Sequence, residues 1–329
     1  MPAQTRVLAF AMDPIESVDI DADTTFVFML EAQRRGHEVL YVDPADLSVS
    51  GGRAAALVTP VTLRRERGDH FEKGPSRRVI LDEEVDAVFQ RKDPPVDLDY
   101  IVSTQILTLC ERAWVLNRPQ GLLAYNEKLM ALLFRDLMPA TIVTRRIEEL
   151  RAFLVAQGGR MIVKPLDGKG GEGVFQVVDG DPNVSSLLEQ ATGLETRCTM
   201  AQQFISDVQT GDKRILLLEG EPLGALLRVP PDGEVRANLH VGARATRTGI
   251  DDADRRIIER LAPRLKREGL YFVGIDVIGG YLTEVNVTSP TGVQEVNALE
   301  GSCLEARVID WLEQGLQARD ERFERSRSD

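Results

Sequence analysis

The first third of the chain alternates short apolar runs with segments whose apolar residues recur every three or four positions. Runs of the first kind are typical of strands and segments of the second kind of amphipathic helices. Their alternation predicts a parallel sheet covered by helices. We expect strands at residues 6–12, 38–42, 82–90 and 113–117, and helices at 25–35 and 101–112. The polar and basic interval 51–78 is expected to be an excursion or a mobile segment. Its basic cluster, Arg64, Arg65 and Arg67, is expected to be a solvated face and not a binding patch.

The pattern changes after a helix expected at 126–137, where shorter strands and glycine-rich turns begin. This second pattern predicts an α+β unit built around antiparallel sheets. Strands are expected at 160–164, 173–178, 200–205, 214–218 and 223–229, and helices at 184–191 and 251–268. We therefore expect an N-terminal α/β domain over 1–122, a central subdomain over 123–200, a C-terminal subdomain over 201–318, and a charged tail at 319–329 that is disordered or a frayed helix end.

Residues 273–286 read as a two-stranded ribbon that carries oxygen ligands at Asp276, Glu284 and Asn286. Glu284 and Asn286 are two positions apart and therefore point to the same side of their strand. Carboxylate and amide oxygens suit Mg²⁺, which proteins usually hold together with substrate phosphates. The ribbon predicts a magnesium site that also binds a phosphate ligand. The alternative is a surface hairpin with exposed acids.

Asp276 can join this site only if it shares the face of Glu284. A plain two-residue turn at Gly279-Gly280 would pair Asp276 with Thr283 and turn the two carboxylates to opposite faces. We therefore expect a three-residue connection from Gly279 to Tyr281, or a bulge that shifts the register by one residue.

A glycine-rich segment matches the dinucleotide pattern G-x-G-x-x-G at Gly168, Gly170 and Gly173. A Rossmann fingerprint opens a helix, but the residues after Gly173 are β-branched and strand-like. No Gly-Lys-Ser/Thr triplet follows either, which excludes a Walker loop. We expect a hairpin whose glycine tip, including Gly171, closes over a phosphate with free backbone N–H groups.

Two lysines complete this electrostatic pattern. Lys164 lies on the strand that enters the glycine loop, and Lys128 lies near the start of the helix that follows Asn126. Their ammonium groups could neutralise nucleotide phosphates. Each taken alone could be an ordinary surface lysine. The combination of loop, lysines and ribbon favours a nucleotide site.

Composition narrows the class of protein. A chain of 329 residues with 43% hydrophobic residues predicts two or three domains with substantial cores. The net charge of −12 argues against nucleic-acid partners and favours small-molecule substrates. Three cysteines without metal-ligand spacing, no signal-peptide pattern and no apolar run of about 18 residues predict a soluble, cytoplasmic protein without a membrane partner. With three histidines in the chain, we expect neither a histidine base nor zinc.

Motifs along nearly the whole chain, up to about Trp311, resemble the ATP-grasp superfamily and, more closely, the bacterial glutathione synthetases. They occur in order at 12–15, 30–36, 91–95, 126–128, 164–168, 211–214 and 286–291. The resemblance implies an ATP-grasp fold preceded by an N-terminal parallel α/β domain. It also implies a ligase that joins γ-glutamylcysteine to glycine, with ATP as co-substrate, Mg²⁺ or Mn²⁺ as cofactor, and a homotetrameric or dimeric assembly.

The same resemblance implies roles for individual residues. Lys128, Lys164, Gly168, Gly170, Gly171 and Gly173 would hold the triphosphate, Gln202, Gln203, Phe204 and Ile205 would surround adenine, and Asp212 would contact the ribose. Asp276, Glu284 and Asn286 match the metal ligands, and Arg214, Arg228 and Lys164 match the catalytic cations. Substrate contacts are implied for Asp13, Arg228, Arg236, Asn238, Arg244, Asn286, Ser289, Pro290 and Thr291.

Residues 229–244 match a mobile loop that shuts over the site in this family, although they could form a plain exposed loop. Two positions depart from many relatives: Ala243 replaces a glycine, and Gln294 stands where some relatives carry arginine. Both departures bear on substrate contacts and lid closure, and neither removes a metal or phosphate group.

Two alternatives remain open at this level. One is another ATP-grasp carboxylate–amine ligase with a different amino-acid or peptide substrate, because the nucleotide half would be the same. The other is a catalytically silent nucleotide-binding homologue. The expected reaction proceeds through an acyl phosphate and requires no protein nucleophile, so positioning and charge stabilisation would carry it.

Overall fold

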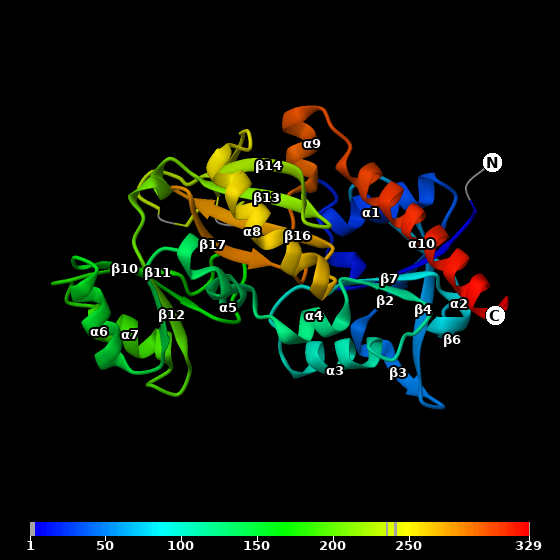
Figure 1. Ribbon diagram of the computed structural model, residues 1–329, viewed down its shortest axis with the longest axis horizontal. Coiled ribbons are helices and arrows are strands. Elements are labelled where there is room, and N and C mark those ends of the chain that lie inside the picture. Colours follow the sequence, from blue (N-terminus) through cyan, green and yellow to red (C-terminus); the bar gives the residue numbers. More distant parts are fainter. Residues whose placement is uncertain (1–3, 235, 240–241, 329) are drawn as a thin grey trace. The chain divides into compact units, whose positions relative to one another are not determined.

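The computed structural model describes residues 4–234, 236–239 and 242–328 and divides into two compact units (Figure 1). The first unit comprises Met1–Ala124, Leu265–Phe272 and Val287–Asp329, and the second comprises Tyr125–Arg264 and Val273–Asn286. This grouping differs from the division expected from sequence, which assigned 287–318 to the C-terminal subdomain. The difference arises because the chain after the ribbon packs against N-terminal helices, as α10 (Leu304–Ser328) does against α1 (Thr24–Arg34).

The first unit contains the predicted parallel sheet. Its strand order is β3-β4-β2-β1-β7-β8, with β1 parallel to β2 and β7, and β7 parallel to β8. The strands are β1 (Val7–Met12), β2 (Glu38–Val42), β3 (Leu47–Ser50), β4 (Arg53–Leu63), β7 (Ala87–Arg91) and β8 (Trp114–Leu116). The α/β class predicted for this part of the chain is confirmed.

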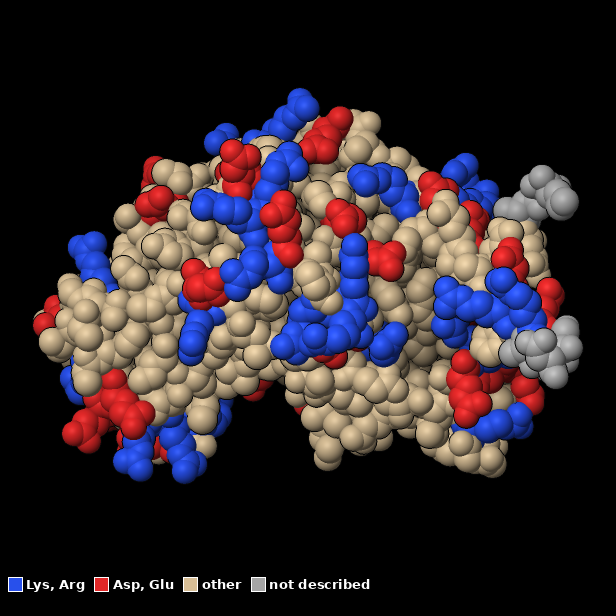
Figure 2. Space-filling view, in the orientation of Figure 1, with Lys and Arg blue, Asp and Glu red and all other residues tan. Residues whose placement is uncertain are grey.

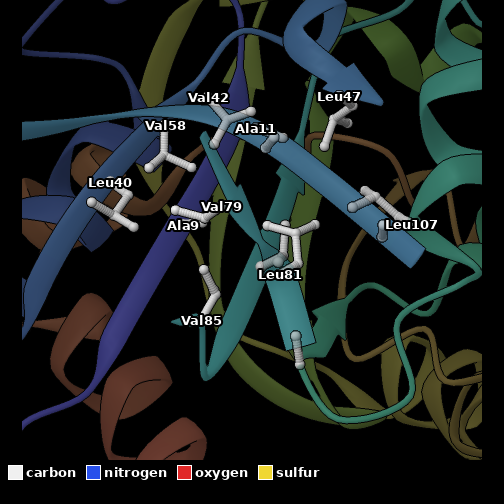
Figure 3. Packing of buried hydrophobic residues seen from close by; sticks show 14 of the residues in the cluster. Ala9, Ala11, Leu40, Val42, Leu47, Val58, Val79, Leu81, Val85 and Leu107 are labelled. Carbon is white, nitrogen blue, oxygen red and sulfur yellow. The ribbon is translucent and has the colours of Figure 1, made fainter. Parts of the chain in front are cut away.

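Alternate residues of β1 serve the two faces of this sheet. Ala9 lies in a buried cluster with Leu40, Val58, Leu81 and Leu107, which lines one face (Figure 3). The next residue, Phe10, stacks on Phe89 on the other face, with ring centroids 4.6 Å apart. Both faces are therefore buried, as expected for a parallel sheet.

Two helices of the first unit begin at side-chain caps. Asp23 accepts from Phe26 N at 2.6 Å to start α1, and Asp97 accepts from Tyr100 N at 2.9 Å to start α3. Helix α3 spans Leu98–Leu107, and the unit also contains α2 (Leu81–Glu84), α4 (Pro119–Ala124) and α9 (Val293–Glu300). The sequence pattern did not predict α9 or α10, and α10 includes residues 319–328 of the expected tail.

The excursion or mobile segment predicted at 51–78 is wrong. This interval forms the long strand β4, β5 (Phe71–Lys73) and the start of β6 (Arg77–Ile80), and β4 pairs antiparallel with β2, β3, β5 and β6. Residues 54–56 of β4 are three buried alanines, whose weak intrinsic strand preference is overridden by pairing on both edges. The basic cluster is also more than a solvated face, since Arg65 Nη1 donates to Gln294 Oε1 at 2.9 Å and Arg67 pairs with Asp21.

Two further predicted elements need correction. The strand expected at 82–90 begins only at Ala87, because the preceding acids form α2 and Asp82 accepts the backbone N–H groups of residues 111–113. The helix expected at 126–137 is α-helical only over α5 (Glu127–Ala131). It continues as a 3-10 segment, Leu132–Leu137, in which Phe134 leaves the helical region at φ −123° and ψ 45°.

The second unit contains two antiparallel sheets, as predicted (Figure 1). The first has the order β11-β10-β12-β9 and carries α6 (Ile147–Ala156) and α7 (Val184–Thr192) around a core that includes Leu150, Val163 and Leu188. Its strands are β9 (Thr141–Thr144), β10 (Arg160–Pro165), β11 (Phe175–Val178) and β12 (Thr199–Gln203).

The second sheet has the order β15-β14-β13-β16-β17. Its strands are β13 (Asp212–Leu218), β14 (Glu221–Val229), β15 (Arg244–Arg247), β16 (Phe272–Ile278) and β17 (Tyr281–Asn286), and α8 (Asp252–Glu268) precedes β16. Strands β16 and β17 are the expected ribbon. A short 3-10 turn, Ser206–Gln209, connects the two sheets of this unit.

Basic and acidic side chains are interspersed over the face in Figure 2. Among the described residues, no helix combines the length and apolar character needed to cross a membrane.

Candidate active site

The turn of the ribbon has two residues, Gly279 and Gly280. Their φ angles are 56° and 78°, and Ile278 pairs with Tyr281 across the turn. Two consecutive residues with positive φ are typical of a type I′ turn and explain why glycine occupies both positions. The three-residue alternative predicted for this turn is therefore wrong.

The bulge alternative is confirmed. Val277 pairs with Leu282, but Asp276 pairs with Glu284, so Thr283 is the extra residue and the register shifts by one. The shift turns Asp276, Glu284 and Asn286 to the same face of the ribbon. Thr283 Oγ1 donates to Asp276 O at 3.1 Å, which ties the bulged residue to the facing strand.

The bulge also supplies an acceptor for Lys164. Lys164 Nζ donates to Thr283 O at 3.1 Å, and the lysine is buried. Burial lowers the pKa of Lys164; the carboxylate of Glu284 opposes this effect, and the ammonium of Lys128 adds to it. A buried ammonium of this kind is not the ordinary surface lysine that the sequence also allowed.

Lys128 joins the ribbon to the glycine loop. Its Nζ lies 3.2 Å from Glu284 Oε1 and donates to Gly168 O at 2.8 Å. The helix that carries it starts locally at Asn126, whose Oδ1 accepts from Lys128 N and Leu129 N at 3.0 and 3.1 Å. The two predicted lysines, the loop and the ribbon therefore meet in one place.

Two arginines hold the carboxylate of Asp276. Arg214 Nε and Nη2 lie 2.5 and 3.0 Å from its two oxygens, and Arg228 Nη2 lies 2.9 Å from Oδ2. Burial works to raise the pKa of Asp276, but the charges of Arg214 and Arg228 outweigh it and hold the pKa well below its ordinary value. Asp276 is thus a fixed anion at neutral pH.

Asp212 lies beside Asp276 and shares Arg228 with it, but its pKa is shifted in the opposite direction. Its Oδ2 accepts from Arg228 Nη2 at 2.6 Å. Burial raises the pKa of Asp212 to about 6; the charge of Arg228 opposes this rise, and the charge of Asp276 adds to it. Asp212 Oδ1 and Arg228 Nε are buried and have no hydrogen-bond partner among the described residues. One free acceptor and one free cationic donor are the groups that a ligand with a hydroxyl and an anionic oxygen would satisfy.

The shared face of the ribbon fits a hard divalent cation. It offers two carboxylates and an amide, and Asn286 Nδ2 lies 3.4 Å from Asp276 Oδ2. No group of three or more His, Cys, Asp or Glu side chains suited to a metal occurs among the described residues. Two carboxylates with substrate oxygens are nevertheless the usual coordination of Mg²⁺, so the donor chemistry fits the expected ion.

The glycine loop connects β10 and β11 as a hairpin, which confirms that the G-x-G-x-x-G match is not a Rossmann fingerprint. Gly170, Gly171 and Gly173 have φ angles of 61°, 84° and 67°. A Cβ built on Gly171 would lie 2.6 Å from Asn238 Oδ1. The loop tip and the segment expected to form a lid therefore touch at Gly171, where the positive φ favours glycine and an added Cβ would displace the Asn238 side chain.

Comparison with known proteins gives the family. A model of the N-terminal domain of prokaryotic glutathione synthetase matches residues 7–122, and a model of the ATP-grasp domain of the same enzyme matches residues 127–301. The chain belongs to the prokaryotic glutathione synthetase family. It is therefore an ATP-dependent ligase with an ATP-grasp fold, as the sequence motifs implied.

Comparison with individual relatives gives the same family. The chain is 46% identical to the glutathione synthetase of Xanthomonas campestris pv. campestris over 307 residues, which cover 92% of this chain and 96% of the relative. Identity to the Vibrio cholerae glutathione synthetase is 43% over 314 residues, covering 94% and 98%. The crystal structure of the D-cycloserine synthetase DcsG matches with a TM-score of 0.68 at 15% identity, covering 94% of this chain and 99% of that one, which shows the shared fold.

The segment expected from sequence to surround adenine lies beside the ribbon turn. Gln202 and Gln203 end β12, Phe204 and Ile205 follow it, and Gln202 Nε2 donates to Thr141 Oγ1 at 3.2 Å. A Cβ built on Gly279 would lie 3.1 Å from Ile205 Cγ2. The turn and the adenine segment are therefore in contact within the second unit.

The residues expected from sequence to contact the peptide substrate are divided between the two units. Asp13, Ser289, Pro290 and Thr291 belong to the first unit, and Arg228, Arg236, Asn238, Arg244 and Asn286 belong to the second. In the second unit, Arg228 contacts Asp212 and Asp276, and Asn286 lies beside Asp276. Arg236 instead pairs with Glu234, with Nη2 2.7 Å from Oε2, and Arg244 is exposed on β15. Val235, His240 and Val241 of the expected lid lie outside the described residues.

Two contacts in the first unit went unrecognised in the sequence. Arg91 Nη2 donates to Pro290 O at 2.9 Å, so a buried arginine at the end of β7 orients one matched residue. Gln294 Nε2 donates to Asp23 O at 2.7 Å and to Ile20 O at 3.2 Å. An arginine directly after a buried apolar strand was the available signal for the first. The second depends on residues about 270 positions apart and left no local signal.

Proposed function

We propose that this protein joins γ-glutamylcysteine to glycine with the hydrolysis of ATP, giving glutathione, ADP and phosphate. The observation that carries the proposal is the meeting of Lys128, Lys164 and the glycine loop with the acidic face of the ribbon. Family membership over more than nine tenths of the chain supports the same substrates.

The nucleotide would be held by groups of the second unit. Lys128 and Lys164 bring two ammonium groups to the glycine loop and the ribbon beside it. The backbone N–H groups of Gly168, Gly170, Gly171 and Gly173 would donate to the phosphates. The segment 202–205 would enclose adenine. Asp212, with its unpaired Oδ1, would accept a ribose hydroxyl.

Asp276, Glu284 and Asn286 would bind the divalent cation, Mg²⁺ or Mn²⁺. When bound, the cation neutralises phosphate charge as it develops. The protein itself fixes the metal ligands in place. Arg214 and Arg228 keep Asp276 ionised and oriented, and Lys128 holds Glu284. These contacts keep two anions on one face before any substrate arrives.

The reaction would proceed in two displacements. A carboxylate oxygen of the dipeptide forms a bond to the γ-phosphorus, and the bond to ADP breaks. The amine of glycine then adds to the acyl carbon, loses a proton, and phosphate leaves with the C–O bonding pair. Arg228, with its free Nε–H, and Lys164 would stabilise the negative charge of both transition states. Closure of residues 229–244 would exclude water from the acyl phosphate.

A substrate panel with ADP release as the readout tests this proposal. The purified protein is given ATP and Mg²⁺ with γ-glutamylcysteine and glycine, and each substrate is then omitted or replaced by a neighbour such as alanine or γ-glutamylalanine. We expect ADP release to require both substrates and the product mass to match glutathione. Turnover without preference for this pair would assign a different ligase, and ADP binding without amine-dependent turnover would assign a silent homologue.

We also propose a cytoplasmic homo-oligomer, a dimer or a tetramer. The outer face of α3 exposes Leu98 (71%), Val102 (45%) and, just beyond the helix, Leu109 (40%), with Gln105 between them and the exposed Asp99 beside them. The occupant proposed for this face is the same face of a second copy, because an apolar stripe is self-complementary in an isologous contact. The three free cysteines agree with a reducing compartment.

A further inference from the structure

The ribbon is held at its base by the side chain of one residue, Asn117. Asn117 follows β8 and is 5% exposed. Its Oδ1 accepts from Phe272 N at 2.8 Å, and its Nδ2 donates to Phe272 O at 2.9 Å and to Val287 O at 2.7 Å. Phe272 is the first residue of β16, and Val287 directly follows the last residue of β17.

These bonds replace backbone pairing where the two strands stop pairing. The last residue pair at this end of the ribbon is Gly274 with Asn286. Beyond this pair, Asn117 binds both backbone polar groups of Phe272, two residues before Gly274, and the carbonyl of Val287, one residue after Asn286. Only a primary amide offers one acceptor and two donors in this geometry, and both N–H groups of Asn117 are used.

The residues around the base are themselves fixed. The Phe272 ring packs edge-on against Phe28 at 5.2 Å, and the Arg91 guanidinium lies 5.7 Å from its centre. Arg91 also donates to Pro290 O. Phe272 and Val287, the two residues that flank the ribbon, are thus held by side chains of the first unit, and Asn117 bonds to both of them.

We infer that Asn117 is a positioning residue for the ligase reaction, because it fixes the spacing and register of the two strands that carry Asp276, Glu284 and Asn286. The inference rests on the proposed function of those three residues. Asn286 is adjacent to Val287, and Asp276 lies four residues from Phe272 along one strand. A change in strand spacing at the base therefore reaches the metal ligands through the covalent chain and the ribbon pairing.

The test uses Asn117→Asp, which has the same shape but replaces both N–H donors with an oxygen that faces two carbonyls. A matched control exists in Gln33, whose Nε2 donates to Leu63 O at 2.9 Å and whose Oε1 accepts from Leu63 N at 2.6 Å. Gln33→Glu removes an equivalent amide clamp from the end of β4, away from the ribbon strands. Asn117→Ala provides a second, milder variant in which water can replace the lost amide.

Two readouts are measured on the full chain. The first is the gain in ADP affinity on adding Mg²⁺, by titration calorimetry, and the second is amide exchange of residues 273–286, by mass spectrometry. For Asn117→Asp we expect about a 10- to 100-fold loss of the Mg²⁺-dependent gain, as is typical when a group behind metal ligands is removed, together with faster exchange of the ribbon. Gln33→Glu should leave both within about twofold of the native protein.

Three results would overturn the inference: unchanged Mg²⁺ gain and exchange in folded Asn117 variants, equal losses in Gln33→Glu, or failure of both Asn117 variants to fold. The last result would make Asn117 a folding element only. Because both readouts use ADP and Mg²⁺ without peptide substrates, a different substrate specificity would refute the proposed function and leave the test of Asn117 intact.

Discussion

Asp276 lies directly opposite Glu284 on the ribbon, although the two-residue turn at Gly279-Gly280 would by itself place Thr283 there. The extra residue at Thr283 restores the shared face of the two carboxylates and exposes a carbonyl that accepts from Lys164. One bulge therefore aligns the acidic groups and anchors a buried cation.

Glu284→Gln tests the role of the ribbon in the reaction. The change removes the charge that would bind the cation and that pairs with Lys128. We expect kcat for ADP release to fall by about 100-fold or more, with little change in melting temperature. Glu259→Gln, on the exposed side of α8, is the control and should retain activity. A folded Glu284→Gln protein with native turnover would rule out a metal role for this carboxylate.

Gly280→Ala tests the turn. Gly280 has a φ of 78°, and the nearest atom to an added Cβ is 3.9 Å away, so the cost is backbone strain without a clash. We expect the free energy of unfolding in urea to fall by about 1–2 kcal/mol. Gly249→Ala, which has open space and no positive φ, should be neutral or slightly stabilising. Equal effects of the two changes would contradict a type I′ turn.

Glu31→Gln tests a source of acid sensitivity in the first unit. The hydrogen bond from Arg34 lowers the pKa of Glu31; burial opposes this, and Arg35 adds to the lowering. A carboxyl with a depressed folded pKa stabilises the protein above its unfolded value of about 4.3, and this stability is lost as pH falls through the folded pKa.

We therefore expect Glu31→Gln to have a lower free energy of unfolding than the native protein at pH 7. The difference should narrow below about pH 4, as measured by urea unfolding at each pH. The control is Glu66→Gln, an exposed position between β4 and β5. A gap that stays constant from neutral to acid pH would show that the carboxylate of Glu31 is not the source.

Val102→Arg tests the proposed self-association through α3. A charge at the centre of the exposed stripe would face its own copy in an isologous contact and should lower the mass measured by light scattering to that of the monomer or a smaller assembly. Val155→Arg, at an apolar position of α6 that is 69% exposed, should leave the mass unchanged. An unaltered mass in Val102→Arg would show that α3 does not form the interface.

The sequence alone determined features that depend on short stretches of chain. Strand and helix alternation in 6–42, the glycine hairpin between β10 and β11, and the residue types of the ribbon all follow from local periodicity and from the chemistry of Gly, Lys and Asp. The ordered motifs determined the family. The requirement that Asp276 and Glu284 share a face also followed from sequence, because strand geometry fixes which residues can do so.

The tertiary structure decided what depends on distant partners. Contacts between segments far apart in sequence set three features: the bulge that realigns the ribbon, the alanine-rich strand β4, and the burial of Lys164 against Thr283. Asn117 reaches Phe272 and Val287 across 155 and 170 residues, respectively. No local pattern encodes such a bond, because pairing distant backbone groups becomes favourable only once folding has removed water from them.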